Sequence, residues 1–343
     1  MPKSGRARTR PLTLAVVLLL ALIVIVVMGA RWYAYERPLP MSADVLDFRV
    51  QPGSSARGIA QAAGAAGVDV DETAFTLLVR WTGTGQALKA GHYQLERGIT
   101  LAQLLAKLRE GAVMRERLTV VEGTTFRDMR ALLAAMPALK QDSAAMTPAQ
   151  LLKAIGATEL HPEGLFAPDT YVFDAGTSDL DIWRQAYRAQ AAALADAWAQ
   201  RKPDLPYATP YEALIMASIV EKETGQAVER PLIAGVFVNR LKRGMLLQTD
   251  PTIIYGLGER FDGNLRKRDL TTDGPYNSYT RAGLPPTPIA LPGRAAIAAA
   301  LQPAATDALY FVARGDGTSH FSPSLDQHNR AVQKYQLGGG ASK

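Results

Sequence analysis

A run of apolar residues near the amino terminus limits what this chain can fold into more than any other feature. Residues 12–30 read LTLAVVLLLALIVIVVMGA and hold no charged side chain. About nineteen such residues suffice to cross the hydrocarbon layer of a membrane as a helix. Arg31 and the aromatic pair Trp32 and Tyr33 close the run, and aromatic residues are typical of the membrane interface. The sequence therefore predicts a membrane-spanning helix over residues 12–33.

The leader before this run, residues 1–11, is basic through Lys3, Arg6, Arg8 and Arg10. Positive charge at this end predicts a cytoplasmic amino terminus and an extracytoplasmic body. A cleaved signal peptide has the same order of charge and apolar core. The core here is longer than usual for a signal, and the bulky aromatic pair makes a poor cleavage site, so we favour an uncleaved anchor.

The rest of the chain is long enough for two folded units, because 343 residues exceed the usual size of one domain. The 38 basic and 32 acidic residues leave a net charge of +6, and much of the excess lies in the leader. No basic face for nucleic acid is therefore expected. The chain has no cysteine, and it shows neither a phosphate loop nor histidines at metal-ligand spacing. We expect no metal and no cofactor.

The pattern of apolar and turn-forming residues predicts an α+β fold in two parts. Strands at residues 45–50 and 89–95 enclose two helices, and a third helix follows Thr100, which forms a capping-box pattern with Gln103. This small α+β subdomain covers residues 45–113. A larger α+β domain, residues 114–338, is predicted to contain a strand at 118–121, helices beginning at 125 and 147, helices at 181–200, 211–225, 231–243 and 326–335, and a hairpin of 309–313 with 320–322.

Three short segments of the larger domain are rich in turn-forming residues. Residues 163–171, 247–252 and 276–286 are predicted to be loops, and loops of this kind often carry function. Trp183 and Trp198 lie at helical positions in an alanine-rich segment, where large aromatic side chains usually pack into a core. We predict core packing for both tryptophans.

Glu221 is the strongest candidate for chemistry, because it lies in an otherwise apolar helix. At 100° per residue it projects near Ala217 and Ser218, whereas Glu223 falls on the far side. Small residues beneath a carboxylate leave room for a ligand, and burial raises the carboxyl pKa toward the value that a general acid needs. The alternative interpretation of Glu221-Lys-Glu223 is a solvated charge run at a helix end.

Other catalytic patterns are missing from the sequence. There is no serine nucleophile elbow, and His320 and His328 are better explained by packing or capping. Acid–base chemistry on a carboxyl group therefore remains. A hydrolase with two carboxylates would need a partner for Glu221, and the available partners are Asp250, Glu223 and Glu163.

Several ordered motifs resemble the endolytic murein transglycosylase (YceG-like) family. They are Ala217-Ser-Ile-Val-Glu-Lys-Glu-Thr224, Val238-Asn-Arg-Leu241, Gln248-Thr-Asp-Pro-Thr252, Ile254-Tyr-Gly256, Tyr276-Asn-Ser-Tyr279 and Gly283-Leu-Pro-Pro286, with Glu163-Gly-Leu-Phe and Pro168-Asp-Thr170 upstream and Leu309-Tyr-Phe-Val-Ala313 and His328-Asn329 downstream. The resemblance covers nearly the whole chain after the apolar run.

The resemblance implies a single-pass protein of the cell inner membrane with a periplasmic LysM-like subdomain at residues 45–113 and a YceG-like catalytic domain at residues 114–338. It implies cleavage of the β-1,4 bond between N-acetylmuramic acid and N-acetylglucosamine within nascent peptidoglycan strands, which leaves 1,6-anhydro ends and limits glycan elongation. Peptidoglycan strands would be the substrate, and cell-wall synthases at the inner membrane would be partners.

For the site, the resemblance implies that the catalytic group is the first glutamate of Glu-Lys-Glu, which is Glu221. One carboxyl group suffices for such a lyase, because the C6 hydroxyl of the muramoyl unit attacks C1 intramolecularly. The residues expected to bind substrate or to support Glu221 are Glu163, Asp169, Ser218, Glu223, Asn239, Gln248, Thr249, Asp250, Tyr255, Tyr276, Asn277 and Tyr279. Two alternatives stay open, a lysozyme-like hydrolase and a non-catalytic peptidoglycan-binding scaffold.

Overall fold

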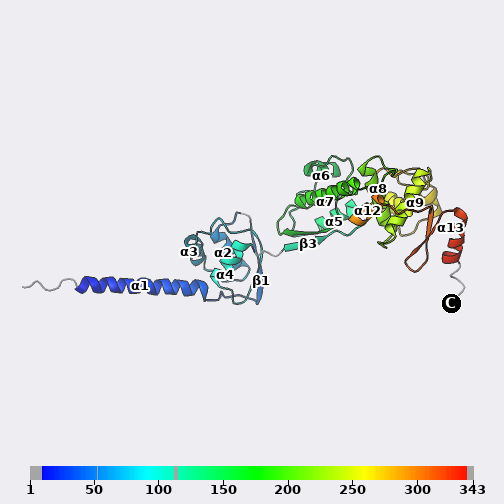
Figure 1. Ribbon diagram of the computed structural model, residues 1–343. Coiled ribbons are helices and arrows are strands. Elements are labelled where there is room, and N and C mark those ends of the chain that lie inside the picture. The colour runs from blue at the N-terminus through cyan, green and yellow to red at the C-terminus, as the bar shows by residue number, and fades with distance from the viewer. Residues whose placement is uncertain (1–9, 52, 112–114, 338–343) are drawn as a thin grey trace, which may run out of the picture. The chain divides into compact units, whose positions relative to one another are not determined.

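The structure is a computed structural model that describes residues 10–51, 53–111 and 115–337 (Figure 1). Residues 1–9 of the expected basic leader, and the boundary expected between residues 113 and 114, lie outside the described residues. The fold is a mixed α+β fold, as predicted. Its internal contacts divide into a smaller unit, Met1–Glu116 with Phe173–Gly176, and a larger unit, Arg117–Val172 with Thr177–Lys343.

Helix α1 (Arg10–Tyr35) contains the apolar run. Its segment Leu14–Tyr35 is long and apolar enough to cross a membrane, and the most apolar 18-residue stretch of it has no buried residue. A long apolar helix that the protein leaves uncovered is typical of a membrane span and also of a signal sequence. At the end of α1, Ala34 packs into the hydrophobic core of the smaller unit.

The smaller unit is built on one antiparallel strand pair. Strand β1 (Val45–Val50) pairs with β2 (Gly91–Glu96), with Val45 opposite Glu96 and Val50 opposite Gly91. Helices α2 (Ala56–Ala65), α3 (Glu72–Trp81) and α4 (Leu101–Glu110) complete the unit. Phe48 and Tyr93, whose ring centroids lie 5.7 Å apart, join the strands to the core. The predicted capping box of Thr100 and Gln103 is present.

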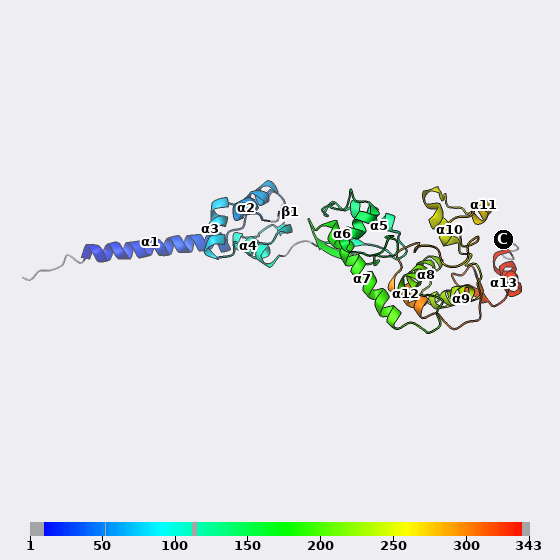
Figure 2. The same ribbon diagram turned by 90° about the horizontal axis from the view of Figure 1, so that it is seen from above.

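The centre of the larger unit is a group of mutually packed helices. They are α7 (Asp179–Ala199), α8 (Pro210–Glu223), α9 (Arg230–Lys242) and α12 (Arg294–Leu301). Figure 2 shows α8 beside α12 and α9. Every residue of α8 from Ala213 to Glu221 is buried, which explains why its sequence is apolar on all sides.

The remaining elements belong to the larger unit, apart from residues 115–116 and 173–174 at the ends of two strands, which are assigned to the smaller unit. They are β3 (Arg115–Thr119), α5 (Phe126–Ala134), α6 (Pro148–Ile155), β4 (Thr170–Asp174), α10 (Asp250–Leu257), the short helix η1 (Gly258–Arg260), α11 (Lys267–Thr271), β5 (Tyr310–Ala313), β6 (Ser319–Ser322), α13 (Leu325–Val332) and the π-helical turn η2 (Gln333–Leu337). The predicted hairpin is present as β5 and β6, with Tyr310 opposite Ser322.

Three local predictions differ from the structure. Helix α10 begins at Asp250, inside the segment predicted as a loop, because Pro251 is well suited to the first turn of a helix. Strand β4 begins at Thr170, inside another predicted loop. Trp183 is fully buried as predicted, but Trp198 is only partly buried, and the Arg201 guanidinium lies 4.1 Å from its ring centroid.

Candidate active site

Glu221 lies near the carboxyl end of α8 and is 9% exposed. Arg230 Nη2 donates a hydrogen bond to Glu221 Oε1 over 3.0 Å. The backbone N–H of Gly293, just before α12, donates to Glu221 Oε2 over 2.9 Å. Both carboxylate oxygens of Glu221 therefore already have a protein donor.

A second carboxylate, Glu122, lies beside this pair, with its Oε2 atom 3.6 Å from Arg230 Nη2. Gly293 is bare at the same place, and a Cβ atom there would lie only 1.9 Å from Glu122 Oε1. Burial raises the pKa of Glu221, as predicted, while the bonds from Gly293 and Arg230 lower it and Glu122 raises it. Neither Glu122 nor Arg230 was predicted as a site residue, because both come from other segments of the chain than Glu221.

The face of α8 that carries the small residues Ala217 and Ser218, next to Glu221, is covered by other parts of the protein. Ser218 has no exposed surface. Its hydroxyl donates to the Ile215 carbonyl over 2.7 Å and accepts the Ile289 N–H over 2.9 Å. The space that the sequence suggested for a ligand is therefore occupied by the segment from Ile289 to Gly293.

Glu223 lies on a different side of α8 and lines a cavity of about 670 Å³, which we call the Glu223 cavity. The Thr249 hydroxyl donates a hydrogen bond to Glu223 Oε1. Burial raises the pKa of Glu223 to about 7, helped by the nearby charge of Asp250 and opposed by the Thr249 bond and by Arg240. A carboxyl group with this pKa is protonated in a large fraction of molecules near neutral pH.

The segment before α10 brings Gln248 and Asp250 to the same cavity. The Gln248 N–H donates to the Ser278 carbonyl, and the Thr249 N–H donates to Ser278 Oγ, each over 3.0 Å. The Tyr279 hydroxyl donates to Asp250 Oδ1 over 2.6 Å. The two turn-rich motifs predicted from the sequence thus hold each other in place and together form one wall of the cavity.

Arg240, which is 7% exposed, also lines the Glu223 cavity. Its side chain donates to the Leu309 carbonyl over 2.7 Å, to the Leu247 carbonyl over 2.9 Å and to Gln248 Oε1 over 3.3 Å. Its guanidinium carbon lies 5.0 Å from the ring centroid of Tyr310. Arg240 therefore ties β5 to the segment before α10, and it belongs to a predicted motif although it was not predicted as a site residue.

His328 of α13 stacks on Tyr310 with ring centroids 5.2 Å apart. Its Nδ1 atom is buried and has no hydrogen-bond partner within the described part of the chain. Burial, and secondarily Arg240, lowers the pKa of His328, which favours the neutral ring. The predicted packing role is thus present, but His328 also lines the Glu223 cavity.

Glu163 lines a second and larger cavity of about 1130 Å³, the Glu163 cavity. The Glu163 side chain accepts the Phe126 N–H over 2.9 Å and the Tyr255 hydroxyl over 3.1 Å. Burial raises the pKa of Glu163 to about 7. Tyr276 meets Tyr255 edge-on with ring centroids 4.9 Å apart, and both rings line the cavity.

The Glu223 and Glu163 cavities are formed by adjacent residues of the same two segments. Glu223 and Asp250 line the first, whereas Lys222 and Pro251 line the second. The end of α8 and the start of α10 therefore contribute to both cavities.

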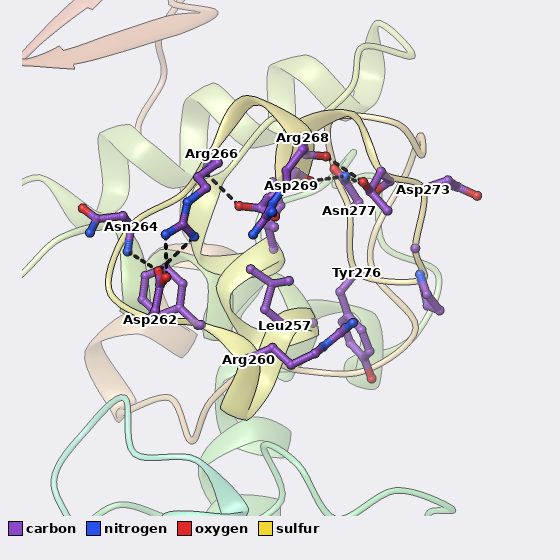
Figure 3. A pocket seen from close by; sticks show the side chains of 16 residues that line it. Leu257, Arg260, Asp262, Asn264, Arg266, Arg268, Asp269, Asp273, Tyr276 and Asn277 are labelled. Carbon is purple, nitrogen blue, oxygen red and sulfur yellow. Dashed lines mark hydrogen bonds and ion pairs between the residues drawn. The ribbon is translucent and has the colours of Figure 1, made fainter.

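A third cavity, of about 490 Å³, lies between α10, α11 and the segment that ends in Asn277 (Figure 3). Phe261 and Tyr276 line both this cavity and the Glu163 cavity. Asn277 is 5% exposed, and its Nδ2 atom donates to the carbonyls of Asp269, Leu270 and Thr272 over 3.1, 3.2 and 2.7 Å. Asn277 therefore shapes the loop that forms the cavity wall.

Two predicted site residues lie elsewhere. Asn239 donates to the Thr306 and Ala308 carbonyls over 2.8 and 3.1 Å and so fixes the approach to β5. Asp169 lines a small cavity of about 210 Å³ together with Glu122 and Arg294. Across the described ranges, no group of three or more His, Cys, Asp or Glu residues is arranged to hold a metal ion.

Comparison with known proteins gives a consistent set of matches. Residues 48–334 match the YceG-like family. The chain is 34% identical over 332 residues to a Bacillus subtilis (strain 168) protein named endolytic murein transglycosylase, with 91% of each chain covered. A Streptococcus pneumoniae (serotype 2, strain D39) protein of the same name is 29% identical over 281 residues, and the match covers 72% of this chain and about half, 51%, of that one.

A solved structure resembles the chain as well. The crystal structure of a yceG-like protein from Listeria monocytogenes superposes with a TM-score of 0.56 at 31% sequence identity. The match covers 84% of this chain and 98% of the Listeria chain.

Proposed function

The chain belongs to the YceG-like family, and from this premise we propose that it is a membrane-anchored endolytic murein transglycosylase. Its substrate is the glycan strand of peptidoglycan, which it cleaves between N-acetylmuramic acid and N-acetylglucosamine. The names of its relatives in Bacillus and Streptococcus support the activity.

The observation that carries the site assignment is Glu223, a residue that lines the Glu223 cavity and whose pKa is raised to about 7 by burial of its carboxyl group. The expectation that Glu221 is catalytic stays a prediction. In the structure both Glu221 oxygens accept a hydrogen bond, from Arg230 and from Gly293, whereas Glu223 accepts one from Thr249 at Oε1. A general acid must reach the oxygen that it protonates. We therefore assign the acid–base role to Glu223, and we assign to Glu221 the role of holding Arg230 and the segment before α12.

The mechanism needs one carboxyl group. Protonated Glu223 donates its proton to the glycosidic oxygen as the bond from this oxygen to C1 of the muramoyl unit breaks. The resulting carboxylate accepts the proton of the muramoyl C6 hydroxyl while that oxygen bonds to C1, which gives the 1,6-anhydro end and restores the acid. The internal nucleophile gains from proximity, so no water and no second base are required.

An endolytic enzyme must bind sugars on both sides of the scissile bond. The Glu223 and Glu163 cavities, which share the end of α8 and the start of α10, supply such an extended surface. Tyr255 and Tyr276 add aromatic faces to it, and the large pocket volumes suit pyranose rings. We propose that the strand runs through both cavities.

A lysozyme-like hydrolase is the second candidate, and Asp250 is the observation that favours it. Asp250 lines the same cavity as Glu223, and a hydrolase uses two carboxyl groups that flank the bond. Mass spectrometry of the digested strands separates the two candidates. Anhydro ends support the lyase, whereas reducing ends would establish the hydrolase.

Paired substitutions test the site assignment. Glu223→Gln should lower the rate of strand cleavage by about 10²–10⁴-fold, the usual contribution of a general acid, while Glu221→Gln should keep most of the rate. Both variants retain a side chain of the same shape. Full activity in Glu223→Gln together with an inactive Glu221→Gln that remains folded would return the acid role to Glu221.

We extend the proposal to the rest of the chain. Helix α1 is the anchor in the inner membrane, with its amino terminus in the cytoplasm. Residues 45–113 form a LysM-like subdomain and residues 114–338 the catalytic domain, both in the periplasm. Cell-wall synthases in the same membrane are the proposed protein partners. Protease protection of an amino-terminal tag in spheroplasts tests the orientation, and digestion of that tag from outside would contradict it.

A further inference from the structure

The third cavity is unusual in the number of charged side chains around it. Its charged lining residues are Arg260, Arg266, Arg268, Asp262, Asp269 and Asp273 (Figure 3). We call it the arginine pocket. On its lining alone the pocket holds three positive and three negative charges, so its preference for a ligand depends on which of these charges are already paired.

Two of the three aspartates are firmly paired. Asp262 accepts hydrogen bonds from Arg266 Nη1 and Nη2, over 3.1 and 2.6 Å. Asp273 receives Arg281 over 2.9 and 2.8 Å, and Arg281 does not line the pocket. The negative charge of Asp273 is thus neutralised by an arginine that lies outside the pocket lining. The lining residues therefore keep an excess of positive charge.

The excess belongs to Arg260. Arg268 has its Nε atom 3.5 Å from Asp269 Oδ1, whereas Arg260 makes no ion pair or hydrogen bond within the described residues. Figure 3 shows the Arg260 side chain reaching from the end of the α10 region toward Tyr276. A guanidinium group presents a planar fork of donors that matches a carboxylate.

The arginine pocket adjoins the proposed path of the glycan strand. Phe261 and Tyr276 line both this pocket and the Glu163 cavity. A substituent on a sugar in the Glu163 cavity can therefore extend past Tyr276 into the pocket. The volume of about 490 Å³ is larger than a single carboxylate needs and lies in the range that holds a small organic ligand.

We propose that the arginine pocket binds a carboxylate carried by a muramoyl unit of the strand, with Arg260 as its anchor. This inference rests on the proposed function. The carboxylate can come from two sources, the peptide stem attached to the lactyl group or the free lactyl group of a muramoyl unit that has lost its peptide. In either case Arg260 selects for muramoyl strands over glycans that lack carboxylates.

The test measures strand binding in the full chain carrying Glu223→Gln, with and without Arg260→Ala. Three probes are compared, namely peptide-bearing strands, strands stripped of peptides by an amidase, and chitin oligosaccharides, which lack carboxylates. Arg260→Ala should weaken binding of the carboxylate-bearing probes by about tenfold, as expected for a lost charged hydrogen bond, and leave chitin binding unchanged. Arg260→Lys should recover part of the loss.

The probes also identify the source of the carboxylate. A loss confined to peptide-bearing strands assigns the pocket to the peptide stem, and a loss confined to stripped strands assigns it to the free lactyl carboxylate. A loss on both probes shows that Arg260 accepts either carboxylate. The matched control is Arg188→Ala. It removes an exposed arginine of α7 that lines none of the cavities described above. Unchanged affinity for both muramoyl probes, or an equal loss on chitin, would overturn the proposal.

Failure of the inference and failure of the proposed function give different results. Cleavage by the wild-type chain tests the function, whereas the binding measurements do not require turnover. An Arg260 effect on affinity without cleavage would leave the arginine pocket standing and remove the transglycosylase assignment. Cleavage without an effect of Arg260→Ala on affinity would support the transglycosylase assignment and overturn the carboxylate site in the arginine pocket.

Discussion

Arg230 and Glu221 form an ion pair with 3.0 Å between Nη2 and Oε1, and their side chains are only 11% and 4% exposed. Removal of one member of such a pair leaves the other charge buried, which typically costs about 3–5 kcal/mol. Glu221→Ala should therefore lower the free energy of unfolding of the larger unit by about that amount. Urea denaturation followed by circular dichroism measures the change.

Glu122→Gln is the control for this prediction. Glu122 is 45% exposed and lies 3.6 Å from Arg230, so its loss should cost less than about 1 kcal/mol. Glu221→Gln keeps an acceptor for the Gly293 N–H and should fall between the two. If Glu221→Ala and Glu122→Gln cost the same, the buried pair does not stabilise the fold in this way.

The proposed role of Glu223 as the acid predicts how cleavage depends on pH. Its pKa is raised to about 7, and the acid is active only when protonated. The rate should therefore be high below pH 7 and fall about tenfold for each unit above it. Initial rates on purified strands at constant ionic strength measure this profile. A rate that stays constant well above pH 7 would contradict the assignment of Glu223 as the acid.

Glu163 has the same raised pKa of about 7, so its contribution to that profile must be separated. Glu163→Gln keeps the acceptor for the Phe126 N–H and mimics the protonated side chain. If Glu223 is the acid, the midpoint of the profile should stay near pH 7 in Glu163→Gln, while Glu223→Gln should leave no descending limb.

Glu163 should also make the stability of the larger unit depend on pH. Its pKa is about 7 in the folded chain against 4.5 for the free side chain, so the folded state binds the proton more tightly. The resulting stabilisation is complete below pH 4.5 and is lost as pH rises to 7, a change of about 3 kcal/mol. Glu163→Gln should remove this contribution and leave that of Glu223, whose pKa is also raised to about 7, as measured by urea denaturation at several pH values. An unchanged slope would show that Glu163 does not titrate in this window.

The parts of the fold that could be predicted from sequence depend on neighbouring residues. Thr100 with Gln103 forms the capping box that its spacing indicates, because a cap is made within one turn of the helix. The helix predicted to begin at 147 is also present, and Thr147 caps it. The hairpin of β5 and β6 could be predicted as well, because its two paired strands are neighbours in the sequence.

The proposed choice of Glu223 over Glu221 rests on contacts that neighbouring residues do not predict. The helical period places Glu221 and Glu223 on different sides, but it does not say what covers each side. Arg230 and Gly293, which close off Glu221, come from α9 and from the segment before α12. Thr249 and Asp250, which meet Glu223, come from another segment again. Only the tertiary packing decides which carboxyl group faces a cavity.

Gln248 is one of two non-glycine residues in the described chain with a positive φ, at +51°. A side chain in this conformation costs about 1–2 kcal/mol, and such strain is often found at functional sites. Gln248 lines the Glu223 cavity, and its Oε1 atom accepts from Arg240 over 3.3 Å. Gln248→Gly should therefore relieve the strain and leave the unfolding free energy unchanged or raised by up to about 1 kcal/mol, while cleavage of strands becomes slower.

Gln248→Ala separates strain from side-chain function, because it removes the amide but keeps a Cβ atom at the same φ. Its cleavage rate should match that of Gln248→Gly, and its unfolding free energy should be lower by about 1 kcal/mol. Cleavage rates of the two variants test the role of the side chain, and urea denaturation of the same variants tests the strain. Wild-type cleavage by Gln248→Gly would show that the side chain is not used, and equal stability of the two variants would show that the conformation is not strained.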